Sequence, residues 1–425
     1  FIKDMKNDFL QIVRLVKNNK FKDSLNLINN ITNHDKNFDL VNLKAFIYFN
    51  LKEFQKSYET YSKAIKLNDN SFMCYSSRGT VSFELGNFSD AINDFKKALS
   101  LNNKLFETYE NIGKCYSNLG ENLSAIKYYN LALNLDPNNN KLIEIITEKI
   151  TETNTSNIDT NKIFETDLAI KNLKYNSFGE KKINETEIIS LIGKANKIID
   201  KNFSNLIFTQ TQIFRRNNLN LNCDRHFSIF KNYKVIPEFC FSCIKVTINL
   251  ENVLDLIKLF IIFDNILLPN NNLRKCMIDL RSNSIANYKG FIYCRSVEEA
   301  EIVKSKVDEI IKFSISRNLS TIIKRGCSEF NKKYPGYKNI EKNHIKYDPN
   351  WKKYETIIDS KFPKFNLMKK DQNTNKGISF NDIMIIRNWL FFASLTKDDA
   401  FKKFNQIYNI NPNLRKIIEQ NKLVR

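Results

Sequence analysis

The sequence predicts a chain of class α + (α+β), in which an N-terminal helical solenoid is followed by a β-α-β-β-α-β domain with extra helices. Two observations predict it. Small and aromatic residues recur with a 34-residue period in the first third of the chain. Between residues 239 and 326, runs that alternate apolar and polar residues flank two helical patterns. With 425 residues, 42% of them hydrophobic, the chain is long and apolar enough for two globular domains.

Three copies of the N-terminal repeat align position by position. They hold small residues or aromatics at the same places, apart from one lysine: Ala45, Gly79 and Gly113; Lys52, Gly86 and Gly120; Ser57, Ala91 and Ala125; Tyr61, Phe95 and Tyr129; Ala64, Ala98 and Ala132. This pattern resembles the tetratricopeptide repeat, in which small residues let two antiparallel helices approach and aromatics fill the gap between them. Asp136-Pro137 closes the last copy, as is usual in that family.

The repeat period also sets the predicted domain boundaries. Residues 151–159 are rich in threonine and asparagine and have no apolar period, which predicts a linker. The predicted units, in chain order, are a degenerate repeat near 4–37, repeats at 38–71, 72–105 and 106–139, a capping helix that ends the array (1–150), a linker at 151–186, and a cysteine-rich α+β domain with a C-terminal helical extension at 187–425.

The resemblance implies a concave, helix-lined groove that binds a peptide or protein segment, and therefore an adaptor or scaffold function. The groove-facing positions are mixed in character: Asn42, Phe46, Phe49, Ser76, Thr80, Phe83, Glu110, Lys114 and Ser117. Lys114 is the one cation among them, so a clamp for acidic peptide tails is not expected. The alternative is an array that merely packs on the rest of the chain. Cys74 and Cys115 lie on repeat helices and are interpreted as packing residues.

The second domain shows strand patterns at residues 239–250, 274–281, 288–295 and 321–326, and helical patterns at 253–268 and 297–313. With right-handed crossovers, this order is that of the ferredoxin-like fold, an antiparallel sheet in the order 4-1-3-2. That topology brings the start of the first two strands and the end of the last two to one edge. We therefore expect five thiols there: Cys240, Cys243, Cys276, Cys294 and Cys327.

Cysteine spacing predicts a metal site in this domain. Six of the eight cysteines lie between Cys223 and Cys327. Cys223-Asp-Arg-His226 and Cys240-Phe-Ser-Cys243 are two ligand pairs separated by 13 residues. Two-residue gaps let one turn present both ligands, and thiolates with a neutral imidazole suit zinc. Cys223, His226, Cys240 and Cys243 are therefore the predicted zinc ligands, with Cys276, Cys294 and Cys327 as secondary candidates.

Three other interpretations of the thiols stay open. An iron–sulfur cluster takes similar soft ligands, which Cys240, Cys243, Cys294 and Cys327 could supply. An enzyme could use Cys327 as a nucleophile, since Lys324-Arg325 precede it and nearby cations favour a thiolate. Finally, the thiols could be small buried residues of a sheet core, which suits Cys276 and Cys294. The sequence contains no P-loop, GxSxG or HExxH motif, so it leaves open whether the protein is an enzyme.

RNA binding is a further alternative for the sheet. Residues 289–294 partly match the pattern of RNA-recognition domains. The side chains that would stack on bases or bind phosphates are Phe291, Tyr293, Lys245, Arg295 and Lys324. However, Ile292 replaces the usual small residue, and the strand at 245–250 lacks the expected aromatic. Nucleic acid is therefore not the favoured partner.

The net charge and the cysteines indicate which partner and which cellular compartment to expect. The net charge of +20 suggests an acidic partner, but the lysines are spread along the chain without a basic arm. The longest apolar run, residues 256–268, is too short and too charged to span a membrane. No apolar leader opens the sequence, which favours a cytoplasmic protein with reduced thiols.

The second half also resembles an uncharacterised cysteine-rich module that follows tetratricopeptide arrays. The resemblance lies in six segments: Gln212–Arg216, Cys223–His226, Val235–Cys240, Arg274–Cys276, Gly290–Cys294 and Lys324–Glu329. It implies a domain identity and no activity.

Overall fold

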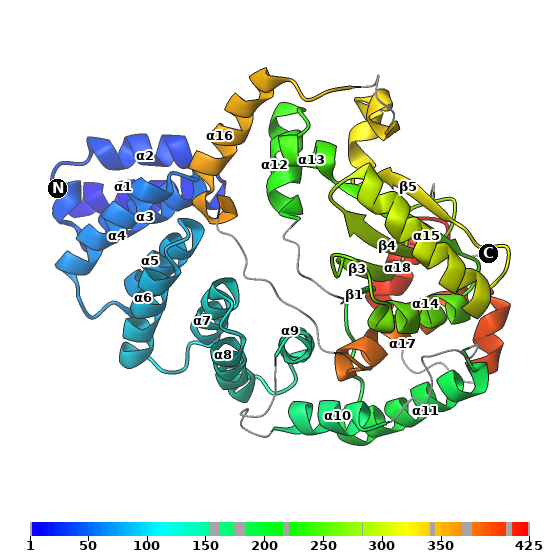
Figure 1. Cartoon of the computed structure of the whole chain (residues 1–425). Coiled ribbons are helices and arrows are strands. Elements are labelled where there is room, and N and C mark those ends of the chain that lie inside the picture. Colours follow the sequence, from blue (N-terminus) through cyan, green and yellow to red (C-terminus); the bar gives the residue numbers. More distant parts are fainter. Residues whose placement is uncertain are drawn as a thin grey trace. The chain divides into compact units, whose positions relative to one another are not determined.

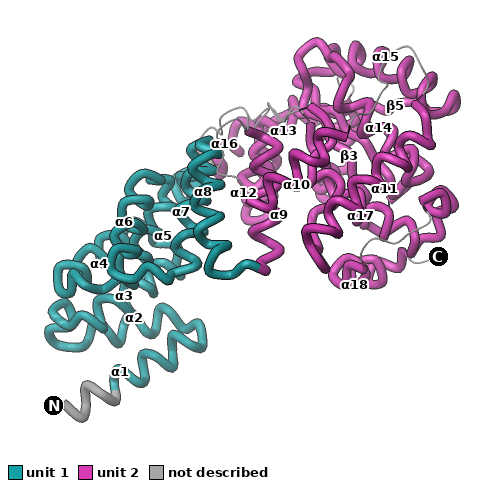
Figure 2. Tube along the Cα trace, turned by 90° about the horizontal axis from the view of Figure 1, so that it is seen from below, with its two compact units in different colours: residues 1–137, 356–370 teal, residues 138–355, 371–425 magenta. Residues whose placement is uncertain are grey.

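The computed structural model describes residues 2–153, 161–173, 183–215, 221–282, 284–340, 345–366, 376–404 and 410–423. Arg216, two stretches of the predicted linker (154–160 and 174–182) and the other intervening residues lie outside this description. The chain forms two compact units, coloured separately in Figure 2: residues 1–137 with 356–370, and residues 138–355 with 371–425. In the described part of the chain, no helix is long and apolar enough to cross a membrane.

The first unit is a solenoid of paired helices, as predicted (Figure 1). Its elements are α1 (Ile2–Lys17), α2 (Phe21–Asn30), the 3-10 helix η1 (His34–Lys36), α3 (Phe38–Asn50), α4 (Phe54–Leu67), α5 (Phe72–Glu84), α6 (Phe88–Leu101), α7 (Phe106–Leu119) and α8 (Asn122–Leu135). Helices α3 and α4, α5 and α6, and α7 and α8 pack as pairs, one pair for each predicted repeat.

Small residues let the helices of each pair approach. A Cβ atom on Gly79 would lie 2.8 Å from the Phe95 ring, and one on Gly113 would lie 2.5 Å from the Tyr129 ring. In the first pair, the Ser57 hydroxyl donates to the carbonyl oxygen of Ala45 at 2.8 Å. The aromatic of one helix therefore packs directly on the backbone of its neighbour, which confirms the repeat interpretation.

The turn inside each pair has the same backbone geometry in all three repeats. Lys52, Gly86 and Gly120, spaced 34 residues apart, have φ angles of 63°, 82° and 74°. Glycine adopts this left-handed conformation without strain. Lys52 has a side chain, so the same conformation is costly there. Its ammonium group lies over the rings of Phe49 and Phe54, at 5.6 and 5.8 Å from their centroids. These cation–π contacts offset part of the conformational cost.

The second unit contains a five-stranded antiparallel sheet surrounded by helices. Its strands are β1 (Gln212–Arg215), β2 (Ile244–Leu250), β3 (Arg274–Ile278), β4 (Tyr288–Cys294) and β5 (Thr321–Arg325). Its helices are α9 (Asn140–Thr151), α10 (Lys162–Lys171), α11 (Glu185–Asn202), α12 (Cys223–Tyr233), α13 (Glu238–Ser242), α14 (Val253–Asn265), α15 (Val297–Ser314), α17 (Phe380–Leu395) and α18 (Pro412–Gln420). Helix α16 (Lys352–Lys361) begins in the second unit and ends in the first.

Short 3-10 helices complete the described structure. They are η2 (Glu329–Lys332), η3 (Pro335–Lys338), η4 (Pro349–Trp351), η5 (Pro363–Asn366) and η6 (Asp399–Phe404). Of these, η5 belongs to the first unit and the other four to the second.

The strands are ordered β1-β3-β4-β2-β5, and every neighbouring pair is antiparallel. Helices α14 and α15 pack against the sheet. Gly290 on β4 lies directly under Leu259 and Phe263 of α14, so the alternate residues Ile292 and Cys294 also face that helix. Lys289, Phe291 and Tyr293 lie on the opposite face. The four predicted strands are present, and β1 is an edge strand that the sequence did not predict.

Two segments differ from the expected boundaries. Residues 239–242 form the end of α13, and the strand expected from residue 239 begins at Ile244. Helix α10 lies inside the predicted linker and packs on α9, α11 and α17. Helix α9, expected to cap the array, is part of the second unit. There the Glu144 carboxylate of α9 accepts hydrogen bonds from the backbone N–H groups of Thr209 and Gln210.

A buried ionic centre links three elements of the second unit. The Arg215 guanidinium of β1 binds Asp264 of α14 and Asp382 of α17, each at 2.7 Å. It also stacks on the Phe260 ring, 4.6 Å from the centroid. Asp382 additionally accepts from the backbone and hydroxyl of Ser379 in a capping box. The edge strand is therefore held to both helices by charge-assisted hydrogen bonds.

Candidate functional site

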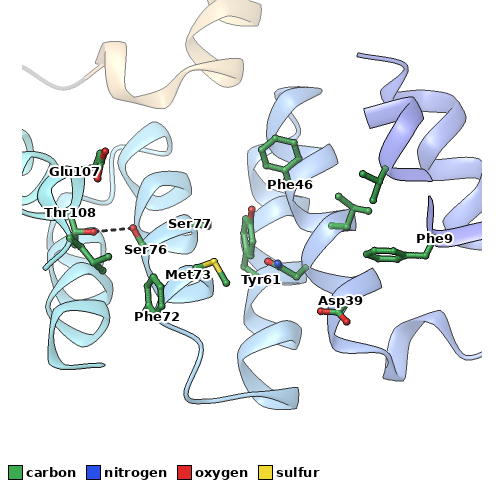
Figure 3. Close-up of a pocket in the computed structure, with 14 residues that line it drawn as sticks. Phe9, Asp39, Phe46, Tyr61, Phe72, Met73, Ser76, Ser77, Glu107 and Thr108 are labelled. Atoms are coloured by element: carbon green, nitrogen blue, oxygen red, sulfur yellow. Dashed lines mark hydrogen bonds between the residues drawn. The ribbon is translucent and has the colours of Figure 1, made fainter. Parts of the chain in front are cut away.

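The array contains a cavity of about 450 Å³ among helices α1, α3, α4, α5 and α7. Three of the nine predicted groove residues, Asn42, Phe46 and Ser76, line it. The Ser76 and Thr108 hydroxyls, from neighbouring repeats, are 3.3 Å apart and form a hydrogen bond across the cavity wall (Figure 3). The cavity therefore spans successive repeats of the array.

The cavity lining is apolar and acidic. Phe46 and Met73 are 43% and 56% exposed, so both present apolar surface to the cavity. Asp39 and Glu107 also line the cavity, while lysine, arginine and histidine do not. Both carboxylates and both apolar side chains are labelled in Figure 3. The lining therefore suits a ligand that combines an apolar side chain with a positive charge.

The other predicted groove residues lie outside the cavity. Glu110 and Lys114 form an ion pair at 2.8 Å. The Thr80 hydroxyl donates to the carbonyl of Ser76, and the Ser117 hydroxyl hydrogen-bonds that of Tyr129. These four side chains thus have partners within the array.

Phe49 and Phe83 lie near a distant part of the chain. Phe362 joins the apolar cluster that contains Phe49 and Phe54, and the Lys364 ammonium lies 5.5 Å from the Phe83 centroid. Residues 356–370 accordingly belong to the first unit. Sequence periodicity could not reveal this contact, because the segment lies far outside the repeats.

In the second unit, Cys240 and Cys327 form a hydrogen-bonded thiol pair. Their hydrogen bond lowers the pKa of Cys327 and raises that of Cys240. Cys240 is buried in a cluster with Ile236, Phe330 and Tyr337, and Cys327 is half-buried against it. The pair joins α13 to the loop after β5, two segments that the sequence already expects to meet.

Two cations that the sequence did not link to Cys327 also favour its thiolate. They are Lys245 of β2 and Lys275 of β3, rather than the adjacent Lys324 and Arg325. Burial lowers the pKa of Lys245, and burial together with the charge of Lys245 lowers the pKa of Lys275 to about 8. The Lys245 ammonium donates to the carbonyl of Gly326 at 2.6 Å, which fixes it beside the cysteine loop.

Cys223 and Cys243 complete a group of four interacting thiols. Burial and the neighbouring Cys327 raise the pKa of Cys223 to about 11 and that of Cys243 to about 12. A Cβ atom on Gly326 would collide with the Cys243 sulfur. His226, the fourth predicted zinc ligand, instead stacks on Phe239 with ring centroids 5.2 Å apart. Among the described residues, no group of three or more histidine, cysteine and acidic side chains is arranged to hold a metal ion.

Cys276 and Cys294 lie on the face of the sheet that α14 covers. Cys276 pairs with Gly290 in the register, and both thiols are buried. Burial raises the pKa of Cys276 well above its usual range and that of Cys294 to about 12. Cys74 and Cys115 are likewise buried, in the array. These thiols occupy packing positions, whereas the Cys240–Cys327 pair is partly accessible.

The residues of the RNA hypothesis lie on the opposite face of the sheet. Phe291 is 6% exposed, and the Lys245 and Lys275 ammonium groups lie 4.7 and 5.5 Å from its centroid. Burial raises the pKa of Tyr293. A base would have to displace both lysines to stack on Phe291, so this ring is not presented as a stacking platform.

We expect Cys327 to react with iodoacetamide faster than Cys223, although both are half-buried. Thiolate is the nucleophile, and the pKa of Cys327 is lowered while that of Cys223 is raised to about 11. Each pKa unit between them changes the thiolate fraction about tenfold below both values.

Alkylation of each cysteine can be followed by mass spectrometry of its peptide as a function of pH. The rate at Cys327 should fall as the pH falls through its lowered pKa, and Cys240→Ala should slow it at pH 7. Equal rates at Cys327 and Cys223 would show that the hydrogen bond does not activate this thiol.

Comparison with known families identifies the array. A profile described as "TPR repeat" matches residues 79–120, and one described as "Tetratricopeptide repeat" matches residues 38–71 and 106–139. No curated protein matches the chain.

Several solved structures are similar to the array. MamA (41-end) from Desulfovibrio magneticus RS-1 is 17% identical, with a TM-score of 0.33, over 34% of this chain and 82% of that one. The first TPR of Spaghetti (RPAP3), bound to the HSP90 peptide SRMEEVD, is 22% identical with a TM-score of 0.26 over 27% and 90% of the two chains. The Arabidopsis OM64 TPR domain is 25% identical with a TM-score of 0.26 over 26% and 93%. Such low TM-scores say nothing about function.

The family profiles and the paired-helix geometry agree. The matched segments 79–120 and 106–139 contain the glycines on which an aromatic of the neighbouring helix packs. Between residues 38 and 139, this chain therefore consists of tetratricopeptide repeats, followed by a region with a small antiparallel sheet and helices.

Proposed function

We propose that this protein is an adaptor that binds a peptide segment of a partner protein in the groove of its repeat array. The observation that carries this proposal is the cavity of about 450 Å³ between successive repeats, with Phe46 and Met73 exposed in its wall. Contiguous exposed apolar side chains in a concave site are typical of binding surfaces.

The ligand should combine an apolar side chain with a lysine or arginine. Phe46 and Met73 offer apolar contact, and the Asp39 and Glu107 carboxylates offer a negative potential without a lining cation. Charge complementarity selects partners and increases their association rate. The groove thus favours basic segments, even though the net charge of the whole chain is +20.

An array of immobilised synthetic peptides tests the proposal, with the apolar residue and the charge varied independently. The full chain should retain peptides that pair leucine or phenylalanine with lysine, and it should lose their aspartate counterparts. Asp39→Lys and Glu107→Lys should each weaken binding severalfold, the usual scale for exposed charge pairs. Asp399→Lys, an exposed carboxylate of the second unit, is the matched control and should change nothing. A preference for acidic peptides, or no selection, contradicts the proposal.

For the second unit we propose a structural zinc site at Cys223, His226, Cys240 and Cys243, as the ligand spacing predicts. Electrostatic coupling among Cys223, Cys240 and Cys243 supports it, and the stacked ring of His226 would have to turn. Elemental analysis of the purified full chain is the test, with one zinc per chain expected. Iron would indicate a cluster, and neither metal would overturn the site.

The alternative for the same thiols is an enzyme that uses Cys327 as a nucleophile. The specific observation in its favour is the lowered pKa of Cys327 beside Lys245 and Lys275. RNA binding is not favoured, because Phe291 is buried beneath the two lysines. Metal-free protein with a fast-reacting Cys327 would favour the enzyme over the zinc site.

We also assign the sheet domain to the ferredoxin-like fold and to the cysteine-rich module that the sequence resembles. The antiparallel order β3-β4-β2-β5, with α14 after β2 and α15 after β4, supports the fold. We also propose a cytoplasmic location, because all eight cysteines are free of disulfide bonds.

A further inference from the structure

A segment from the C-terminal half of the chain packs on the repeat array, outside the cavity described above. The described residues 356–366 belong to the same compact unit as the array, and Figure 2 colours them with it. Helix α16 ends at Lys361, and Pro363 follows at the start of η5, so the helix stops where the chain meets the array. The Phe362 ring then packs on Phe54, and the Lys364 ammonium lies over the ring of Phe83, a predicted groove residue.

Phe362 fills an aromatic subsite. It lies 6.2 Å from the Phe54 ring, in the cluster that includes Phe49, Tyr58 and Leu85. Phe49 and Phe83 hold the same position in successive repeats, 34 residues apart. The Phe362 cluster therefore combines residues of two successive repeats, and Phe83 lies beside Lys364 instead.

Lys364 fills an acidic subsite beside it. Its ammonium binds the Glu84 carboxylate at 2.7 Å and lies 5.5 Å from the Phe83 centroid. Both charged side chains are about three-quarters buried, with 27% and 21% exposed. A hydrogen-bonded ion pair over an aromatic ring is specific for a cation at this point.

We propose that Phe362-Pro363-Lys364 is an internal ligand of the array, and that it competes with partner peptides in which an aromatic residue precedes a lysine by two positions. This inference rests on the proposed peptide-binding function and specifies its ligand and its regulation. The open cavity is a separate part of the array, and its lining favours the same combination of apolar and basic groups. A tethered ligand acts at a high effective concentration, so it blocks a partner peptide until that peptide outcompetes it.

The test uses a fluorescein-labelled peptide of residues 356–366 and the full chain, with fluorescence anisotropy as the readout. Wild-type protein should bind it weakly, because its own segment fills the site. The Phe362→Ala/Lys364→Glu protein should bind the same peptide at least about tenfold more tightly, as expected when about nine-tenths of the sites are blocked in the wild type. Lys364→Glu alone changes a partly exposed side chain and should give a smaller gain in the same direction.

Two controls make the result specific. Lys312→Glu, an exposed lysine of α15, should leave peptide binding at the wild-type level. The Glu84→Lys protein should reject the natural peptide and bind a peptide with glutamate in place of the residue equivalent to Lys364.

Equal binding by wild type and the double variant, or binding by neither, overturns the internal-ligand proposal. If the peptide array of the previous section still selects basic apolar peptides, the adaptor function survives that result. If it selects none, the adaptor function fails as well.

Discussion

Arg215→Ala should destabilise the second unit by about 3–5 kcal/mol, the usual cost of removing one partner from a buried ion pair. The guanidinium is almost fully buried and binds Asp264 and Asp382 through three charged contacts of 2.7 to 3.1 Å. Burial alone would lower the pKa of Arg215, but the carboxylates of Asp382 and Asp264 raise it, so the side chain stays charged. Without it, two buried carboxylates face each other without their shared cation.

The two tryptophans make this measurable. Trp351 and Trp389 both belong to the second unit, and the Trp389 indole donates to the carbonyl of Thr211, next to β1. Urea unfolding followed by tryptophan fluorescence therefore reports on this unit in the full chain. Arg215→Met should lower the free energy of unfolding nearly as much as Arg215→Ala, because methionine keeps the apolar volume of the side chain but not its charge.

The matched control is Arg281→Ala. Arg281 also binds a buried carboxylate, Asp279, at 2.7 Å, but it is 54% exposed, and Asp279 keeps Lys289 as a second partner. We expect a loss of about 1 kcal/mol or less there, as for exposed ion pairs. If Arg215→Ala costs no more than Arg281→Ala, the centre is solvated and does not hold β1 to the helices.

The repeats could be predicted because their information is local and periodic. Gly79 and Gly113 recur at fixed spacing, and each meets its aromatic 16 residues later. The alternating strands and apolar helices of the second unit follow from the same kind of pattern. Strand β1 was missed because it has four residues and no long alternation, and it is held in place by Arg215 through residues far away in the sequence.

The candidate sites were predictable only in part, for related reasons. The loop after β5 was expected beside Cys240, and Cys327 of that loop packs on the cluster that contains Cys240. The cations near Cys327 were taken from its sequence neighbours, whereas strand pairing brings Lys245 and Lys275 instead. Phe362 lies more than 300 residues from Phe49 and Phe54, so no repeat period could connect them.

Gly113→Ala should destabilise the array by about 1–3 kcal/mol, the usual cost of an overpacked core. Alanine favours a helix over glycine by about 0.8–1.0 kcal/mol, so propensity alone predicts the opposite sign. Here, however, the new methyl group would lie 2.5 Å from the Tyr129 ring. That ring is buried, and its hydroxyl hydrogen-bonds Ser117. The ring cannot move away without separating α7 from α8.

Gly193→Ala is the matched control, because it adds the same methyl group to α11 with no atom within 4 Å. It should stabilise its helix by up to about 1 kcal/mol. Hydrogen exchange followed by mass spectrometry resolves the two regions in the full chain: exchange in residues 106–135 should speed up in Gly113→Ala, and exchange in residues 185–202 should slow in Gly193→Ala. If both variants slow exchange, the Tyr129 ring can move to accommodate a methyl group. The repeat glycines would then not be required for the close approach of the helices.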